Sequence, residues 1–344
     1  MIIAVDAMGG DHAPAEIVKG AARASKLHDV DIILVGREDA IRHCLPAEFA
    51  RSGRIEIRNA TEMIGMDEHA AAVRTKKDAS VVVAACLAKE GKADAVVSVG
   101  NTAAAMAVAT LGLGRITGID RPAIATLMPN KSGVTVMLDA GAVVDCTPEM
   151  LLQFGVMGSI YAQKVLGVRN PRVGLLSIGE EKCKGNELTR ATYDLLESSR
   201  LNFVGNVEGR DLFSGKADVI VADGFVGNVA LKAAEGVVDL IKSTIKGTVS
   251  SDPLAWLGMA LLAPGAMLML PSLMRLKRSL DYREHGGAPL LGIDGVFVIG
   301  HGRSNAHAVT NAVRAAKEAV EGGVVSAIRE AVVESPRIRA AAHE

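Results

Sequence analysis

The sequence predicts a three-layer α/β/α protein with a mostly parallel sheet. Three observations lead to this fold. Short apolar segments alternate with longer segments of helical periodicity, several of the short segments are apolar at nearly every position, and 36 glycines mark many of the junctions. Continuous apolar strands are typical of parallel sheets that helices cover on both faces. The alternation favours repeated strand–helix–strand units.

Ten short segments have the composition of strands, because Val, Ile, Leu and Ala dominate them and Gly, Asn or Asp often follow them. In chain order they are Ile2–Val5, Asp31–Val35, Ile55–Arg58, Ala95–Val99, Ala123–Met128, Val134–Leu138, Arg172–Ser177, Asn202–Val204, Asp218–Val221 and Val296–Ile299.

Longer segments between these strands have helical spacing of apolar residues. They are Pro14–Lys26, Asp78–Lys89, Pro148–Leu166, Glu187–Leu196, Asn228–Lys246 and Asn305–Val320. No low-complexity linker interrupts the pattern. We therefore expect one α/β domain over residues 1–344, with an inserted helical hairpin at 247–285.

The hairpin is predicted from Pro253–Met274, 22 residues without a charge. Pro264-Gly265 divides it into arms of about 16 and 22 Å, each shorter than a hydrocarbon core of about 30 Å. An apolar tip above a basic base is typical of helices that lie on a membrane. We expect peripheral membrane contact; packing in a dimer interface or in the core is the alternative. The contact residues would be Leu257, Leu261, Leu262, Arg275, Lys277 and Arg278.

The overall composition excludes some classes of protein. A net charge of −1 argues against a nucleic-acid partner, because binding to phosphate backbones needs a basic excess. The four cysteines are far apart and form no C-x-x-C pair, which favours a reducing cytoplasm. The N-terminal segment has no basic region followed by an apolar one, so we expect no signal peptide and a cytoplasmic location.

Polar, glycine-rich clusters follow five of the predicted strands. Ligands of open α/β sheets bind beyond the carboxyl ends of strands, where helix N-termini offer free amides. Each cluster alone is explained by a turn and a helix cap, but five together indicate the wall of an anion-binding cleft. The clusters are Asp6–His12, Ser98–Thr102, Asp139–Ala142, Ile178–Asn186 and Asp223–Asn228.

Several catalytic motifs are missing from the sequence. It has no G-x-S-x-G elbow, no phosphate-binding G-x-x-x-x-G-K-[ST] loop and no H-E-x-x-H. Gly112-Leu113-Gly114 is not completed to G-x-G-x-x-G, because Thr117 takes the last glycine's place. We therefore expect neither a nicotinamide cofactor nor a metal.

Seven segments, in this order over nearly the whole chain, resemble the bacterial acyl-carrier-protein:phosphate acyltransferase (PlsX) family. They are DAMGGD (Asp6–Asp11), GNT (Gly100–Thr102), DAGA (Asp139–Ala142), GEEKCKG (Gly179–Gly185), NFVGNVEGRD (Asn202–Asp211), DGFVGN (Asp223–Asn228) and GGAPLLG (Gly286–Gly292). Three positions depart from the family pattern: Ala103 replaces a glycine, Val143 an asparagine and Val226 a threonine.

The resemblance implies a fold like that of isocitrate and isopropylmalate dehydrogenases and of phosphotransacetylase, as a homodimer. It implies transfer of a fatty acyl group from acyl carrier protein to inorganic phosphate, giving acyl-phosphate for phospholipid synthesis. A membrane glycerol-3-phosphate acyltransferase would then consume the product. The basic residues of the hairpin would also be available to acidic acyl carrier protein.

From position and resemblance we expect Lys184, His301 and Asn228 to be catalytic. Lys184 would neutralise phosphate or the oxyanion, and His301 would protonate the leaving thiolate or contact phosphate. Asp6, Asp11 and Asp223 would orient amides and lysines. Backbone amides at Gly100–Thr102 and Gly224–Asn228 would hold the phosphate. The full set expected at the phosphate site is Asp6, Gly9, Gly10, Asp11, Gly100, Asn101, Thr102, Gly179, Gly185, Asp223, Gly224 and Gly227.

Two other functions fit the same fold. One is a phosphate acetyl- or butyryltransferase that uses acyl-coenzyme A, with the same chemistry and another donor. The other is a lipid-responsive regulator without turnover. A metal- and nicotinamide-dependent dehydrogenase would need a trio of carboxylates that the sequence does not offer.

Overall fold

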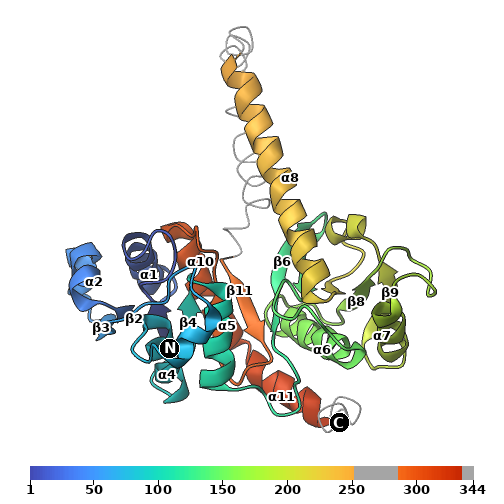
Figure 1. Ribbon diagram of the computed structural model, residues 1–344, viewed down its shortest axis with the longest axis horizontal. Helices are drawn as coiled ribbons and strands as arrows, with labels where there is room; N and C mark the ends of the chain where they lie inside the picture. Colours follow the sequence, from blue (N-terminus) through green and yellow to red (C-terminus); the bar gives the residue numbers. More distant parts are fainter. Residues whose placement is uncertain (252–285, 335–344) are drawn as a thin grey trace.

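The computed structural model describes residues 1–251 and 286–334, and it confirms a mostly parallel α/β fold. The strands form two sheets, which lie side by side with helices around them (Figure 1). One sheet has seven strands in the order β3-β2-β1-β4-β12-β11-β5. The other has five strands in the order β6-β7-β10-β8-β9.

In the seven-stranded sheet, five neighbouring strands from β3 to β12 are parallel, and β11 runs antiparallel to both of its neighbours. The carboxyl ends of β1, β4 and β12 therefore meet at one edge. The bounds are β1 (Ile2–Asp6), β2 (Asp31–Gly36), β3 (Ile55–Asn59), β4 (Ala95–Ser98), β5 (Ala123–Ile124), β11 (Ala288–Leu291) and β12 (Val296–Ile299).

In the five-stranded sheet, β7, β10, β8 and β9 are parallel, and β6 pairs antiparallel with β7. The bounds are β6 (Thr126–Asn130), β7 (Gly133–Leu138), β8 (Arg172–Leu176), β9 (Asn202–Val207) and β10 (Val219–Val221).

The six predicted helices are present, together with four others in the described part of the chain. The bounds are α1 (Ala15–Leu27), α2 (Glu38–Cys44), α3 (Ala47–Ala50), α4 (Ser80–Lys89), α5 (Thr102–Val108), α6 (Pro148–Lys164), α7 (Glu187–Glu197), α8 (Gly224–Ser251), α10 (Ala306–Glu321) and α11 (Val324–Glu334), with single turns η1 (Ala70–Arg74), η2 (Ala109–Leu113) and η3 (Gly209–Phe213).

Alternate residues of the central strands bury their side chains on opposite faces, as a pleated strand requires. Ile3 and Val5 of β1 pack with α1 and α10, whereas Ala4 belongs to the cluster that contains α4 and α5. In β7, Val136 and Leu138 pack with α6, and Met137 joins the cluster of α4 and α5. That cluster contains residues of both sheets, so one continuous core joins them.

Two expectations about strands are wrong. Ala123–Met128 is not one strand, because β5 pairs with β11 in the first sheet and β6 pairs with β7 in the second. Between them the Ala125 amide donates to the Pro289 carbonyl oxygen (3.0 Å), so the chain crosses between the sheets here. The strand β11 was missed, because its proline and the two glycines before it are typical of a turn.

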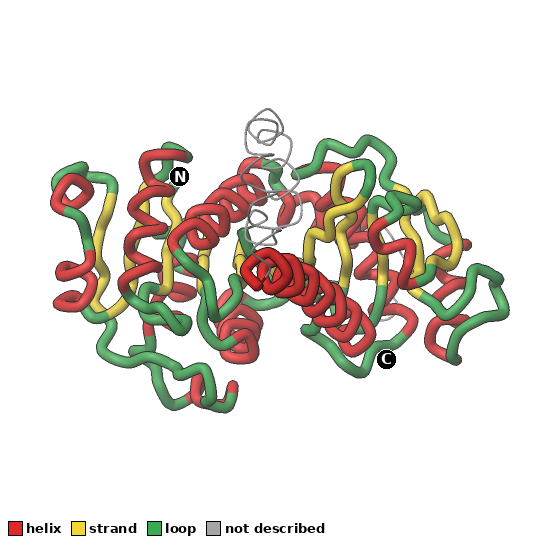
Figure 2. The backbone as a smooth tube through the Cα atoms, turned by 90° about the horizontal axis from the view of Figure 1, so that it is seen from above, coloured by secondary structure: helices red, strands yellow, loops and turns green. Residues whose placement is uncertain are grey.

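Helix α8 starts at Gly224, between the two sheets, and then extends away from the body (Figures 1 and 2). Its last turns, to Ser251, are the described part of the expected hairpin at 247–285. The remainder of that hairpin lies outside the described residues, as do the contact residues predicted within it.

The first turn of α8 sits directly on the end of β7. A Cβ atom on Gly227 would lie 1.9 Å from the Asp139 carbonyl oxygen. We therefore expect Gly227→Ala to lower the free energy of unfolding by at least about 2 kcal/mol, the usual range for overpacking. Gly236→Ala is the matched control in the same helix, because its Cβ would meet nothing within 4 Å. Urea unfolding checks both, and a Gly227→Ala variant as stable as the control would contradict this packing.

Candidate active site

Buried Asp6 organises the loops at the carboxyl ends of β1 and β4. Its carboxylate accepts hydrogen bonds from Ser80 Oγ (2.6 Å), Ser98 Oγ (2.7 Å) and the Met8 amide (3.2 Å). Burial raises the pKa of Asp6, and the bonds from Ser80 and Ser98 oppose that rise. Asp6 thus orients loop groups, the role that the sequence predicted for it.

The glycines of these loops allow close backbone contact. A Cβ on Gly9 would lie 2.6 Å from Asp6 Oδ2 and 2.9 Å from the Gly100 Cα atom. The Asp11 amide donates to the Gly302 carbonyl oxygen (2.8 Å), which ties the loop after β1 to the loop after β12. The predicted residues Gly9, Asp11 and Gly100 therefore lie in loops that contact one another.

Asn101 has two structural tasks. Its side-chain oxygen caps α5 by accepting from the Ala104 amide (3.0 Å). Its Nδ2 atom donates to the carbonyl oxygens of Gly65 (3.2 Å), Met66 (3.1 Å) and Glu68 (2.8 Å). Asn101 therefore holds the loop before η1 against the start of α5.

Asp139 organises the turn that follows β7 in the five-stranded sheet. Its Oδ1 accepts from the amides of Ile124 (2.9 Å) and Gly141 (3.2 Å), and its Oδ2 from those of Ala142 (2.8 Å) and Val143 (2.6 Å). Burial raises the pKa of Asp139, against the effect of these four bonds. The Val143 amide thus donates to Asp139, although valine departs from the family pattern at this position.

The start of α8 differs from the expectation. Asp223 Oδ1 accepts from the amides of Phe225 (3.0 Å) and Val226 (2.9 Å). The Gly224 amide donates to the Val143 carbonyl oxygen (2.8 Å), and the Gly227 amide to that of Asp223 (2.9 Å). These four amides are already paired, so they are not available to hold phosphate as we expected.

A cavity of about 840 Å³ opens between the two sheets. Its walls come from α5 and η2, the strands β5 and β6, the turn after β7, α8, and the loop after β12. Most of its lining is apolar. Three of the predicted site residues line it: Thr102, Asn228 and His301. Ala103, one of the positions that depart from the family pattern, lines it too. The polar side chains in the lining are those of Thr102, Thr110, Thr126, Asn228, Lys232, Glu235, His301 and Ser304.

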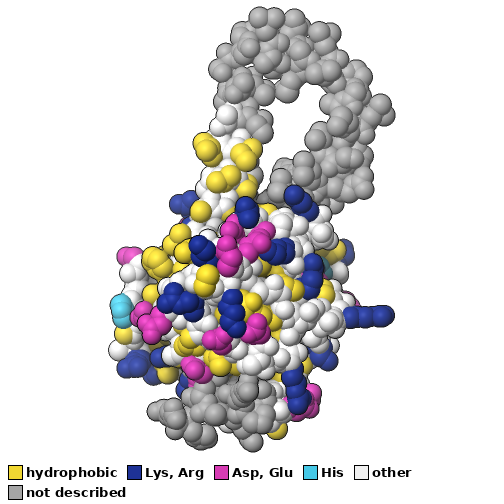
Figure 3. Space-filling view, turned by 90° about the vertical axis from the view of Figure 1, so that its right-hand side faces the viewer, with side chains coloured by type: hydrophobic (Ala, Val, Ile, Leu, Met, Phe, Trp, Pro, Cys, Tyr) yellow, Lys and Arg dark blue, Asp and Glu magenta, His cyan; other side chains and the backbone are white. Residues whose placement is uncertain are grey.

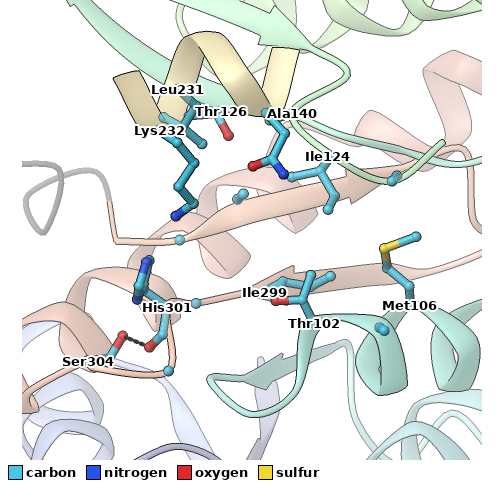
Figure 4. A pocket seen from close by; sticks show the side chains of 18 of the residues that line it. Thr102, Met106, Ile124, Thr126, Ala140, Leu231, Lys232, Ile299, His301 and Ser304 are labelled. Carbon is cyan, nitrogen blue, oxygen red and sulfur yellow. Dashed lines mark hydrogen bonds between the residues drawn. The ribbon is translucent and has the colours of Figure 1, made fainter. Parts of the chain in front are cut away.

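The side chains of Lys232 and His301 point toward one another across one side of the cavity (Figure 4). Lys232 Nζ lies 2.9 Å from Glu235 Oε2, one turn along α8. Ser304 holds the His301 carbonyl oxygen through its amide (2.9 Å) and its hydroxyl (2.5 Å). Partial burial and then the charge of Lys232 lower the pKa of His301 below its usual 6.5, which favours the neutral imidazole.

Sequence reasoning missed Lys232. The available signal was its spacing: it lies four residues after Asn228 in a predicted helix, and residues at i and i+4 share one helix face. Without knowledge that this face borders a cavity, Lys232 was one of many helical lysines.

Lys184 lies elsewhere. It is exposed in the loop between β8 and α7, with Gly179 and Gly185, and none of the three lines the cavity. Gly185 has a φ of 103°, and a Cβ there would lie 2.0 Å from Thr189 Oγ1, so the glycine serves the turn. The catalytic role of Lys184 stays a prediction.

Two features are absent from residues 1–251 and 286–334. Within them, no three His, Cys, Asp or Glu side chains are grouped so as to hold a metal ion. No helix in this part of the chain is long and apolar enough to cross a membrane.

Comparison with known proteins connects this chain to a family. A family model described as "Fatty acid synthesis protein" matches residues 1–327. A phosphate acyltransferase from Desulfitobacterium hafniense (strain DSM 10664 / DCB-2) is 53% identical over 343 residues, which are 99% of each protein.

Two solved structures share the fold at low identity. A phosphotransacetylase from Streptococcus pyogenes has a TM-score of 0.59 and 17% identity, over 97% of this chain and 94% of that one. A 4-hydroxythreonine-4-phosphate dehydrogenase from Klebsiella pneumoniae has a TM-score of 0.54 and 12% identity, over 93% of this chain and 98% of that one. They confirm the fold class and carry no further conclusion.

The proximity of Lys232 gives a test of the site's electrostatics. In wild type we expect an NMR titration of the His301 ring to give a pKa below 6.5. Lys232→Met should raise it, because a cation that disfavours imidazolium is removed, although burial remains. Lys92→Met is the control, since exposed Lys92 pairs with Glu90 (2.7 Å). A His301 pKa that is the same in wild type and Lys232→Met would contradict the contact.

Proposed function

This chain belongs to the fatty acid synthesis protein family and is a phosphate acyltransferase, and we propose that the cavity between its two sheets is where a fatty acyl group passes from acyl carrier protein to inorganic phosphate. The resemblance to the acyl-carrier-protein:phosphate acyltransferase family is thereby confirmed. The observation that carries the proposal is one cavity with Lys232 and His301 on one side and a mostly apolar lining elsewhere.

The reaction needs no covalent enzyme intermediate. An oxygen of hydrogen phosphate attacks the thioester carbonyl carbon, a C–O bond forms and the C–S bond breaks. The phosphate proton goes to the leaving sulfur, so the products are acyl-phosphate and the free thiol of the carrier. The enzyme has to place the two reactants together and to stabilise the tetrahedral oxyanion.

The lining residues fit these tasks. Lys232 supplies the positive charge that draws phosphate and offsets the oxyanion. Neutral His301 accepts the phosphate proton and returns it to sulfur. Thr102 and Ala103, in the first turn of α5, add amides that have no partner within their helix, while the amide of Ala104 is taken by Asn101. The Asn228 carboxamide donates to the same region.

The alternatives have less support. A phosphate acetyl- or butyryltransferase that uses acyl-coenzyme A shares the fold, but at 17% identity the phosphotransacetylase likeness concerns the fold alone. A regulator without turnover would have no need for a cation and an imidazole that face one another in the cavity.

We also propose a homodimer, a cytoplasmic location and peripheral membrane contact, with a membrane glycerol-3-phosphate acyltransferase as consumer of the product. Membrane contact rests on the uncharged sequence after α8, outside the described residues. Flotation with anionic liposomes tests it: wild type should float and Leu261→Glu/Leu262→Glu should not, and wild type left in the soluble fraction would refute membrane contact.

The dimer proposal is supported by α8. Five apolar side chains of this helix are each more than half exposed: Phe225, Val229, Val237, Leu240 and Ile241. Figure 3 shows apolar side chains, in yellow, on the part of α8 that extends from the body. Large apolar side chains that gather on an exposed surface are typical of interaction sites.

We expect sedimentation at micromolar concentration to show a dimer for wild type and a monomer for Val237→Glu/Leu240→Glu, because burying two carboxylates opposes association. Ile178→Glu is the control, an 81% exposed apolar residue outside α8. A wild-type monomer, or a double variant that remains dimeric, would refute a dimer through this surface.

The catalytic proposal is tested by comparing two lysines. Lys232→Met should lower kcat by about 10²-fold or more, the usual loss when one electrostatic contact to the oxyanion is removed. Lys184→Ala is measured beside it, with acyl-phosphate as the readout and the melting curve as a check on folding. Full activity in Lys232→Met together with a large loss in Lys184→Ala would move the catalytic cation from the cavity to the loop after β8.

A further inference from the structure

One wall of the cavity is a single face of a helix. Thr102, Ala103, Met106, Ala107, Thr110 and Leu111 all line it. Their spacing of one and then three residues places them on one side of α5 and η2. Over these nine steps the helix rises roughly 13 Å. The cavity therefore follows the helix as an elongated space.

The turn η2 continues this face beyond α5. It is a π-helical turn, in which the Gly114 amide donates to the carbonyl oxygen of Ala109, five residues earlier (3.3 Å). Such wide turns are rare and occur frequently at functional sites. Leu111 lies on this turn, lines the cavity and is 59% exposed, so this end of the cavity opens to solvent.

The polar and apolar parts of the cavity are separated in space. Figure 4 shows Lys232 and His301 on one side and Met106 on the opposite side, with Ile124 and Ile299 between them. We call the part lined by Met106, Ala107, Thr110, Leu111 and Ile124 the apolar arm. It contains no charged side chain.

We propose that the apolar arm binds the acyl chain of the donor, and that the residues of α5 and η2 set the preference for long chains. This inference rests on the proposed function. The thioester carbonyl lies at the side of Lys232 and His301, and the chain runs along α5 toward Leu111. An extended chain of single bonds advances about 3.6 Å in three bonds, so roughly 13 Å takes about a dozen carbons.

Such an arm binds short acyl chains more weakly than long ones. Each methylene that leaves water for an apolar site contributes about fourfold to affinity. Because the arm opens at Leu111, carbons beyond about the twelfth pass into solvent or onto a surface, and they add little. The arm thus predicts a preference that rises with chain length and then levels off.

The test measures kcat/KM at saturating phosphate with butyryl, octanoyl, dodecanoyl and palmitoyl esters of acyl carrier protein. In wild type the value should rise up to dodecanoyl and then flatten. Leu111→Glu places a charge at the far end of the arm, and Met106→Trp fills it. Each should lower the ratio of dodecanoyl to butyryl kcat/KM by at least about tenfold, the loss expected for two or more methylenes. Leu27→Glu, at a 71% exposed leucine of α1, should leave the ratio unchanged.

Calorimetric titration with dodecanoate separates this inference from the proposed function. Wild type and Leu27→Glu should bind it, and Leu111→Glu should bind at least about tenfold more weakly. If wild type makes no acyl-phosphate but binds dodecanoate in this pattern, the function is wrong and the arm stands. If acyl-phosphate forms with the same chain-length profile in wild type and both arm variants, the arm is refuted.

Discussion

Buried Asp139 links the two halves of the molecule by a hydrogen bond. It follows β7 of the five-stranded sheet, and its Oδ1 accepts a hydrogen bond from the amide of Ile124 in the seven-stranded sheet. The amides of Gly141, Ala142 and Val143 in the following turn also donate to this carboxylate. Gly227 allows α8 to pack against the Asp139 carbonyl oxygen. A buried carboxylate without such partners would cost several kcal/mol. Asp139 therefore helps the continuous core to fix both walls of the cavity relative to one another.

Asp6 does for the first sheet what Asp139 does for the second. Each follows the buried part of a strand, and each pairs its oxygens with hydroxyl or amide donors of nearby loops. The glycines beside them allow backbones to touch. The glycine-rich clusters thus allow close packing, and under the proposed function the charge chemistry belongs to Lys232 and His301.

Much of the fold could be predicted from sequence, because strands that are buried on both faces are apolar at nearly every position. This pattern can be recognised without knowing which strands pair. The division into two sheets could not, since Ala123–Met128 has uniform strand character and only its partners separate β5 from β6. The motifs led to the correct family, and three of the residues they predicted, Thr102, Asn228 and His301, line the cavity. They did not single out Lys232, whose place in the cavity lining depends on which face of α8 meets it, and they favoured Lys184, which lies in an exposed loop outside the cavity.

The central claim is that phosphate and the acyl chain meet in the cavity between the sheets. A crystal structure with inorganic phosphate and a carrier protein bearing an inert thioether in place of the thioester tests it most directly. The account predicts phosphate within hydrogen-bonding distance of Lys232 and the chain along α5 toward Leu111. Phosphate bound at the Lys184 loop, or a chain that lies outside this cavity, would contradict it.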